Sequence, residues 1–249
     1  MVTIQINPND NKVKKVMPVS EKFNKKSIND WLYAYLQSIS YVDKNGVTFV
    51  YPKDVNLKSI WKIHPWVLNT QKKTRDFEPY IRINYRTLAR QMAILEGTGF
   101  VVRGSVIGLD GKEIPNAYIL PLPNDTPYKL IPLITIKYML RTLQPNCIKV
   151  YLYLLNKYEW KKKDNKIYVF TAKELIESCL GMESTTNERD WFAMKCILDI
   201  LSKCKLINIR RSVKSFSGHK YLVWELEKVS IEIEQEEVLK YFGESLEEI

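Results

Sequence analysis

The sequence has 249 residues, of which 45% are hydrophobic and 12% aromatic, so it is long enough for one large or two ordinary packed domains. No run approaches the roughly 18 consecutive apolar residues of a membrane span, and residues 1–20 hold no apolar block of signal-peptide length, which predicts a cytoplasmic protein without membrane contact. The net charge of +10 divides into +17 over residues 1–224 and −7 over residues 225–249. A basic body attracts polyanions, although lysines outnumber arginines 29 to 9 and a Lys-rich background composition would also raise the charge.

The motifs that usually mark catalysis or metal binding do not occur in the sequence. The four cysteines form no C-x-x-C pair, and the two histidines, His64 and His219, lie far apart, so we expect reduced, buried thiols and no metal site. Neither a G-x-x-x-x-G-K-[ST] phosphate loop nor a G-x-S-x-G nucleophile elbow is present. The sequence therefore predicts a protein that is not an enzyme and needs no cofactor.

The first periodic segment begins near residue 28. Apolar residues recur there with the spacing of one helix face, at Ile28, Trp31, Leu32, Tyr35, Leu36 and Ile39. Residues 47–51 then form an apolar, β-branched strand, and Pro52 predicts the start of a second helix, since a first helical residue needs no N–H. Basic and aromatic residues interleave over residues 61–80. This segment is either a lid packed on its domain or a backbone-binding loop, in which case Lys72, Lys73 and Arg75 would contact DNA.

A third helix and a hairpin complete this half. Taking Leu88, Met92 and Leu95 as the inward face puts Arg86 and Arg90 on the outward face, where two arginines four residues apart suit guanine edges or phosphates. The alternative is an ordinary solvated helix face. The chain then forms a hairpin of residues 100–103 and 117–120 with its turn at Asp110-Gly111. The candidate DNA-binding residues of this half are Arg82, Arg86, Arg90 and Lys112.

The same pattern returns in the second half of the chain. Residues 47–55 resemble residues 167–175 at an offset of 120, and the apolar positions of residues 88–101 match those of residues 194–207 at an offset of 106. The two offsets differ by 14 residues, which indicates an insertion in the first copy, around residues 61–80. The second copy has a helix over residues 148–155, a T-x-x-E capping box at Thr171 and Glu174, and a hairpin of residues 206–210 and 221–226 that turns near Ser217-Gly218.

The third helix of the second copy has a mixed outward face. With Met194, Leu198 and Leu201 inward, Phe192 and Cys196 point outward and suit a protein contact better than a groove. Two groups of residues remain as candidate DNA contacts: the helix start with Thr185, Thr186, Asn187 and Arg189, and the hairpin with Arg210, Arg211, Lys214, His219 and Lys220. The hairpin residues would bind phosphates.

Each half therefore has the order helix, strand, helix, helix, strand, hairpin turn, strand, which resembles the winged helix-turn-helix fold. We expect an α+β protein of two tandem winged helix-turn-helix domains, residues 21–122 and 123–229, joined by a short Pro-rich linker. An N-terminal arm of residues 1–20 precedes them, and an acidic helix or tail of residues 230–249 follows. In that tail Leu239 and Phe242 belong to an apolar stripe that would contact a partner protein or the chain's own basic surface; a disordered solubilising tail is the alternative.

The phrase from Lys129-Leu130-Ile131-Pro132 to Tyr158, leading into residues 170–175, carries a family likeness. It is similar to the opening of the winged-helix domain in replication initiators of plasmids and phages from low-GC Gram-positive bacteria, and in the DnaD-like primosomal family. The resemblance covers residues 20–228 and implies sequence-specific binding of double-stranded DNA at origin repeats, a homodimer, and recruitment of a host helicase or loader. Two alternatives stay open: a transcriptional repressor of a mobile element, and a winged-helix scaffold for protein interactions.

Overall fold

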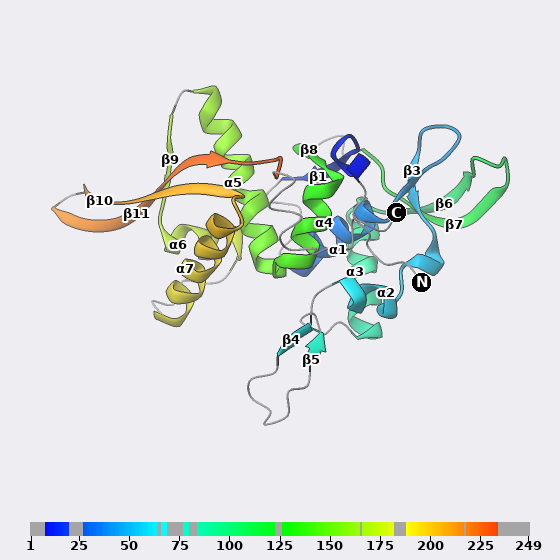
Figure 1. Cartoon of the computed structure of the whole chain (residues 1–249), viewed down its shortest axis with the longest axis horizontal. Helices are drawn as coiled ribbons and strands as arrows, with labels where there is room; N and C mark the ends of the chain where they lie inside the picture. The colour runs from blue at the N-terminus through cyan, green and yellow to red at the C-terminus, as the bar shows by residue number, and fades with distance from the viewer. Residues whose placement is uncertain are drawn as a thin grey trace. The chain divides into compact units, whose positions relative to one another are not determined.

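The computed structural model describes residues 8–19, 27–63, 66–68, 77–79, 84–122, 126–164, 166–181, 188–216 and 218–233. The chain divides into two compact units, one of residues 1–17, 31–125 and 130–144, the other of residues 18–30, 126–129 and 145–249. Helices and small sheets mix along the chain (Figure 1), so the expected α+β class is confirmed. None of the described helices has the length and apolar character that crossing a membrane requires.

The elements up to residue 144 are η1 (Pro8–Asn11), β1 (Lys14–Pro18), α1 (Ser27–Ser38), β2 (Tyr41–Val42), β3 (Thr48–Val50), η2 (Pro52–Asp54), α2 (Leu57–Ile63), β4 (Trp66–Leu68), β5 (Phe77–Pro79), α3 (Tyr85–Gly97), β6 (Val102–Ile107), β7 (Glu113–Ile119), β8 (Tyr128–Pro132) and α4 (Leu133–Thr142). The elements from residue 145 are α5 (Pro145–Lys163), β9 (Tyr168–Phe170), α6 (Ala172–Glu174), η3 (Leu175–Cys179), α7 (Glu188–Lys203), β10 (Ile207–Phe216) and β11 (His219–Val229).

The main sheet of the first unit has the strand order β2-β3-β7-β6. Its strands pair antiparallel, with Phe49 of β3 opposite Ile119 of β7, and β7 returns against β6 as the expected hairpin. Phe49, Val106 and Ala117 form its buried apolar cluster. Gly111 lies in the hairpin turn with φ 79°, a conformation that costs glycine little.

Helix α1 is buried more completely than a one-sided apolar pattern implies. Every residue from Trp31 to Gln37 is buried, including the polar end of Gln37, whose amide donates to the Tyr33 hydroxyl at 3.0 Å. The Tyr35 hydroxyl donates to the carbonyl oxygen of Asp54 at 2.8 Å and so joins α1 to η2. Pro52 begins η2 as the sequence predicts, but α2 starts only at Leu57.

Two parts of the first unit were not anticipated from the sequence. Residues expected to form an arm contribute η1 and β1, and β1 forms a two-stranded sheet with β8. Helix α4 follows, and the Lys137 ammonium binds the Asp10 carboxylate at 2.6 Å. The unit thus takes in residues 130–144, which the sequence pattern assigned to the second domain. Within the insertion, β4 and β5 pair antiparallel, with Trp66 opposite Pro79.

The second unit packs its helices around a three-stranded sheet of order β10-β11-β9. Residues 147–155 of α5 are buried, as are Met194, Leu198 and Leu201 of α7. Phe170 of β9 stacks on Trp224 of β11 with ring centroids 6.1 Å apart. The hairpin β10–β11 is longer than the sequence predicts and extends beyond β9 (Figure 1).

One half of the predicted capping box is confirmed. Thr171 is the N-cap of α6, and its hydroxyl oxygen accepts from the backbone N–H of Glu174 at 3.1 Å. The Glu174 carboxylate, which a reciprocal box would turn toward the N-cap, accepts a short hydrogen bond from the Tyr168 hydroxyl. Strand β9 and helix α6 are therefore joined by side chains as well as by the backbone.

Candidate nucleic-acid interface

Helix α3 presents a basic face to solvent in the first unit. Its N-terminus is capped by Asn84, whose side-chain oxygen accepts from the backbone N–H of Thr87 at 2.8 Å. Leu88, Met92 and Leu95 are buried, and Arg86 and Arg90 are exposed, as the helical spacing predicts.

The rest of that face is small or aromatic. Ala89 and Ala93 are exposed beside the two arginines, and Tyr85, in the first turn, is 77% exposed. No acidic residue lies in the first turn, and within the described residues no carboxylate forms an ion pair with Arg86 or Arg90. A narrow helix face with unneutralised guanidinium groups can approach a polyanion closely.

The hairpin of the first unit adds little unpaired positive charge. The Arg103 side chain donates to the Glu96 carboxylate at 2.9 Å and to the Tyr118 hydroxyl at 2.6 Å. Lys112, a predicted DNA contact, is exposed beside the turn and lies 3.8 Å from the Asp110 carboxylate. The helix therefore carries the clearer binding surface of this unit.

The outward face of α7 differs from that of α3. Its first turn is acidic, with Glu188 and Asp190. Phe192 is 62% exposed and Trp191 39% exposed, while Cys196 is half-buried. An acidic first turn disfavours a phosphate backbone, and exposed aromatic rings are enriched at protein interfaces, so the sequence-based prediction of a protein contact at Phe192 and Cys196 stays a prediction.

The β10–β11 hairpin separates two neighbouring arginines. Side chains of successive residues in a strand point to opposite faces, so Arg210 and Arg211 cannot serve one surface. Arg210 pairs across the strands with Glu225, and Arg211 with Trp224. Trp224 is buried in the core, which places Arg211 on the α7 side of the hairpin and Arg210 on the outer side.

On the outer side, the Glu225 carboxylate contacts two basic side chains of the hairpin, Arg210 and Lys214. It accepts from Arg210 Nε at 3.1 Å and from Ser212 Oγ at 3.2 Å, and it lies 3.1 Å from Lys214 Nζ. The hydrogen bonds from Arg210 and Lys214 lower the pKa of Glu225 to about 2. With Glu227 3.7 Å from Arg210, this face has no excess of positive charge.

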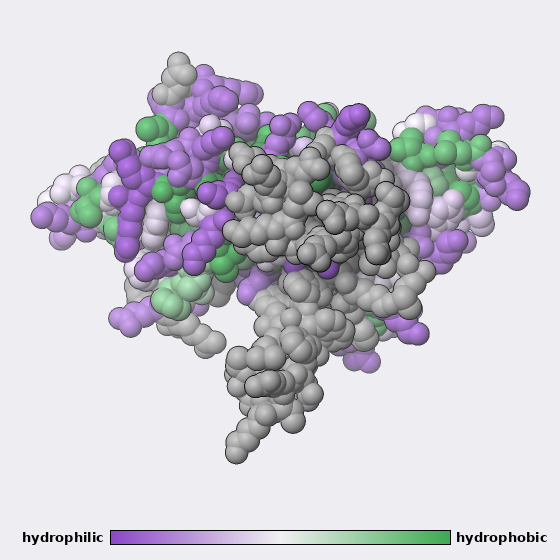
Figure 2. Space-filling model, in the orientation of Figure 1, coloured by the Kyte–Doolittle hydropathy of each residue, from purple (hydrophilic) through white to green (hydrophobic). Residues whose placement is uncertain are grey.

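Other basic residues of the hairpin lie away from Glu225. Arg211 lines a shallow groove of about 190 Å³ between α7 and β10 with Lys195, Asp199, Ser202, Ile209 and Trp224. His219 and Lys220 are exposed beside the turn, where the His219 ring lies 6.5 Å from the ring of Tyr221. The hairpin end of the second unit is mostly hydrophilic, with small hydrophobic patches (Figure 2).

Several predicted contacts lie outside the described residues. These are Arg82, Lys72, Lys73, Arg75, Thr185, Thr186, Asn187, Leu239 and Phe242. Arg189 belongs to α7, but its side chain is not among those that the structure describes.

Sequence reasoning missed Tyr85 and Glu225. Tyr85 directly follows the N-cap Asn84, and tyrosine at a helix start gives no specific signal. Glu225 had a usable signal, because a two-residue turn at Ser217-Gly218 fixes the register that pairs residue 225 with residue 210.

No group of three or more His, Cys, Asp or Glu side chains suited to a metal occurs in the described part of the chain. Comparison of the chain with protein-family models, with curated proteins and with solved structures gives no match.

Proposed function

We propose that the chain is a sequence-specific double-stranded DNA-binding protein built from two winged helices. The two halves share an order of elements that supports this fold: a helix, a strand, two short helical segments, another helix and a hairpin. The strands β2, β4 and β5 are additional in the first half. In both halves the strand before the short helical segments pairs with the returning strand of the hairpin, β3 with β7 and β9 with β11. This pairing is the arrangement that lets a winged helix present its third helix and its hairpin together.

The outward face of α3 is the observation that carries the proposal. The major groove accepts one α helix, and arginine bonds guanine O6 and N7 with two hydrogen bonds. Arg86 and Arg90 supply two such groups one turn apart, and Ala89 and Ala93 leave room for the helix to approach the base edges. Tyr85 adds a hydroxyl donor at the helix start.

In the second unit we propose fewer DNA-contacting residues on the hairpin than the sequence suggests. Arg211, His219 and Lys220 bind phosphates from the α7 side and the turn of the hairpin, whereas Arg210 and Lys214 are held by Glu225. The net charge of +17 over residues 1–224 supports long-range attraction to DNA.

The resemblance to plasmid and phage initiators supports a replication origin as the proposed site of this DNA binding. Footprinting on the DNA of the element that encodes the chain tests it. Protection of repeated sequences in an origin supports initiation, protection restricted to a promoter supports a repressor, and no duplex binding at low salt contradicts the proposal and leaves the scaffold.

A protein-docking role for α7 is the second proposal. The exposed rings of Trp191 and Phe192 beside the acidic Glu188 and Asp190 favour a partner with apolar and basic side chains, such as a host helicase or loader. Phe192→Ser should abolish capture of such a partner and leave duplex binding unchanged. Equal loss of both would assign α7 to DNA.

A further inference from the structure

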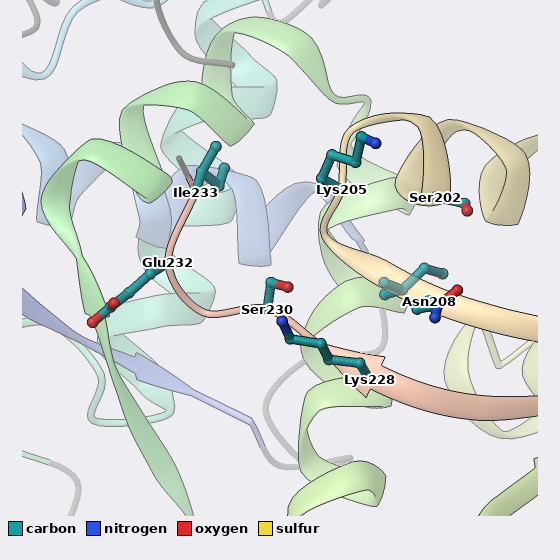
Figure 3. A pocket seen from close by; sticks show the side chains of 8 residues that line it. Ser202, Lys205, Asn208, Lys228, Ser230, Glu232 and Ile233 are labelled. Atoms are coloured by element: carbon teal, nitrogen blue, oxygen red, sulfur yellow. The ribbon is translucent and has the colours of Figure 1, made fainter. Parts of the chain in front are cut away.

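The second unit contains a second pocket, which shares only Ser202 with the groove beside Arg211. It has a volume of about 510 Å³ and lies at the base of the β10–β11 hairpin. Figure 3 shows two segments facing each other across it: the end of α7 with Ser202 and Lys205, and the residues after β11 with Ser230 and Ile233. The pocket is within the range of volumes that hold small ligands or a few side chains.

Backbone hydrogen bonds fix both walls. Lys205 has a positive φ of 58° at the end of α7, and the N–H of Leu206 donates to the carbonyl of Leu201 at 3.1 Å. The N–H of Ser230 donates to the carbonyl of Leu206 at 2.8 Å, and the carbonyl of Ser230 accepts from the Tyr151 hydroxyl at 2.9 Å. The pocket is therefore a feature of the folded backbone and does not depend on side-chain rotamers alone.

The lining combines apolar and cationic groups. Ile207 and Ile233 are buried, whereas Lys205 and Lys228 are exposed at the rim. The Asn208 amide is held by the Glu227 carboxylate at 2.9 Å. Glu232, the acidic residue of the lining, extends away from the other labelled side chains in Figure 3. Such a lining fits a peptide that carries both carboxylates and apolar side chains.

We propose that this pocket binds the acidic segment that follows it in the chain, residues 234–249. The described chain ends at Ile233, which is itself part of the pocket wall. The next 16 residues contain six glutamates, one lysine and the apolar Val238, Leu239 and Phe242. Their attachment at the pocket edge gives an effective concentration in about the millimolar range, so weak charge and apolar contacts are enough to hold them.

Docking at this pocket keeps the acidic segment away from the hairpin turn. Two cross-strand pairs mark the ends of the hairpin: Ile207 opposite Val229 at its base, and Phe216 opposite His219 beside its turn. They are nine residues apart along β10, or roughly 30 Å. That distance exceeds the screening length of about 8 Å at physiological ionic strength. The docked segment therefore leaves the basic residues His219 and Lys220 available to DNA and does not compete with DNA for them.

Amide hydrogen exchange on the full-length chain, followed by mass spectrometry, tests this proposal. Residues 234–249 should exchange about tenfold more slowly in the protein than in a synthetic peptide of the same sequence. Lys205→Glu with Lys228→Glu should remove the protection, and adding Glu236→Lys with Glu237→Lys should restore it. Lys162→Glu with Lys163→Glu, which makes the same charge change at exposed positions of α5, should have no effect.

Two results would overturn the proposal. One is exchange of residues 234–249 at the rate of the free peptide in the unmodified protein, and the other is protection that persists in the pocket variant. Because a glutamate at position 205 follows a helix C-terminus and can disturb folding, Lys205→Ala with Lys228→Ala provides a milder pocket variant. Unchanged exchange of β10 and β11 confirms that each variant is folded.

Discussion

Arg210 donates to the carboxylate of Glu225 from the facing strand, with Nε 3.1 Å from Oε2, so a cation expected to bind DNA already has an anionic partner within the protein. Lys214 shares the same carboxylate. The pair sits on the outer face of the hairpin, opposite the face that carries Arg211.

Glu225→Gln should strengthen duplex binding at low salt. The substitution keeps the shape of the side chain and removes the charge that neutralises Arg210 and Lys214, so we expect a gain of a few fold in affinity that vanishes at high salt. Fluorescence anisotropy with a labelled duplex at two salt concentrations measures it. Glu177→Gln is the matched control at an exposed glutamate of η3 that pairs with Lys173, and an equal gain there would remove the role assigned to Glu225.

Stability should fall in acid through the same carboxylate. The folded pKa of Glu225, about 2, lies below its ordinary value of 4.5, so its contribution is complete above pH 4.5 and is lost as the pH falls toward 2. Urea denaturation between pH 5 and pH 2 should show a smaller decline in Glu225→Gln than in the unmodified protein. Parallel declines would mean that other carboxylates dominate.

Asp30 should give stability the opposite dependence on pH, in a higher pH range. Burial raises its pKa to about 7, partly offset by Lys149, and its Oδ2 atom has no hydrogen-bond partner among the described residues. Because the folded state holds this proton more tightly than the unfolded state, stability should decrease as the pH rises from 4 to 7. Asp30→Asn should flatten that part of the curve, as measured by denaturation across the same range.

Arg86→Ala and Arg90→Ala should each weaken specific duplex binding by about 1 to 3 kcal/mol, and nonspecific binding by less. Competition assays with the footprinted site and with unrelated DNA measure the two affinities. Lys58→Ala, an exposed lysine of α2 with the same charge change, is the control. Equal losses on both DNAs would restrict the arginines to the phosphate backbone.

The two helix caps should contribute measurably to stability. Asn84→Ala and Thr171→Ala each remove an acceptor for a backbone N–H, at 2.8 Å and 3.1 Å, and should cost about 1 kcal/mol. Asn84→Asp and Thr171→Ser keep an acceptor and should restore most of the loss. Thermal denaturation of the four variants distinguishes capping from other effects of the substitutions.

The sequence predicts elements well where one face of a segment meets solvent. Leu88, Met92 and Leu95 repeat with helical spacing because the other side of α3 is exposed, and the same spacing correctly places Arg86 outside. Ser217-Gly218 identifies the turn of the second hairpin because a two-residue turn favours glycine with positive φ, here 80° at Gly218.

Segments that are buried on all sides carry no such pattern. Residues 133–136 and 138–140 of α4 are all buried, so apolar residues follow one another without a period and the helix was missed. The pairing of β1 with β8 joins residues more than a hundred positions apart, which local patterns cannot reveal. In the candidate site, the opposite directions of Arg210 and Arg211 follow from strand geometry, but only once β10 is known to extend to Phe216.

The division of the chain has a consequence for its synthesis. The second unit contains residues 18–30 as well as residues 145–249. A ribosome adds about 5 to 20 residues per second, so on the order of ten seconds separate the emergence of these two parts. Residues 18–30 must wait for partners that do not yet exist, while residues 31–125 of the first unit are made in between. A chain released prematurely near residue 122 therefore carries residues 18–30 of the second unit and lacks residues 130–144 of the first, and a single cut there cannot yield two intact halves.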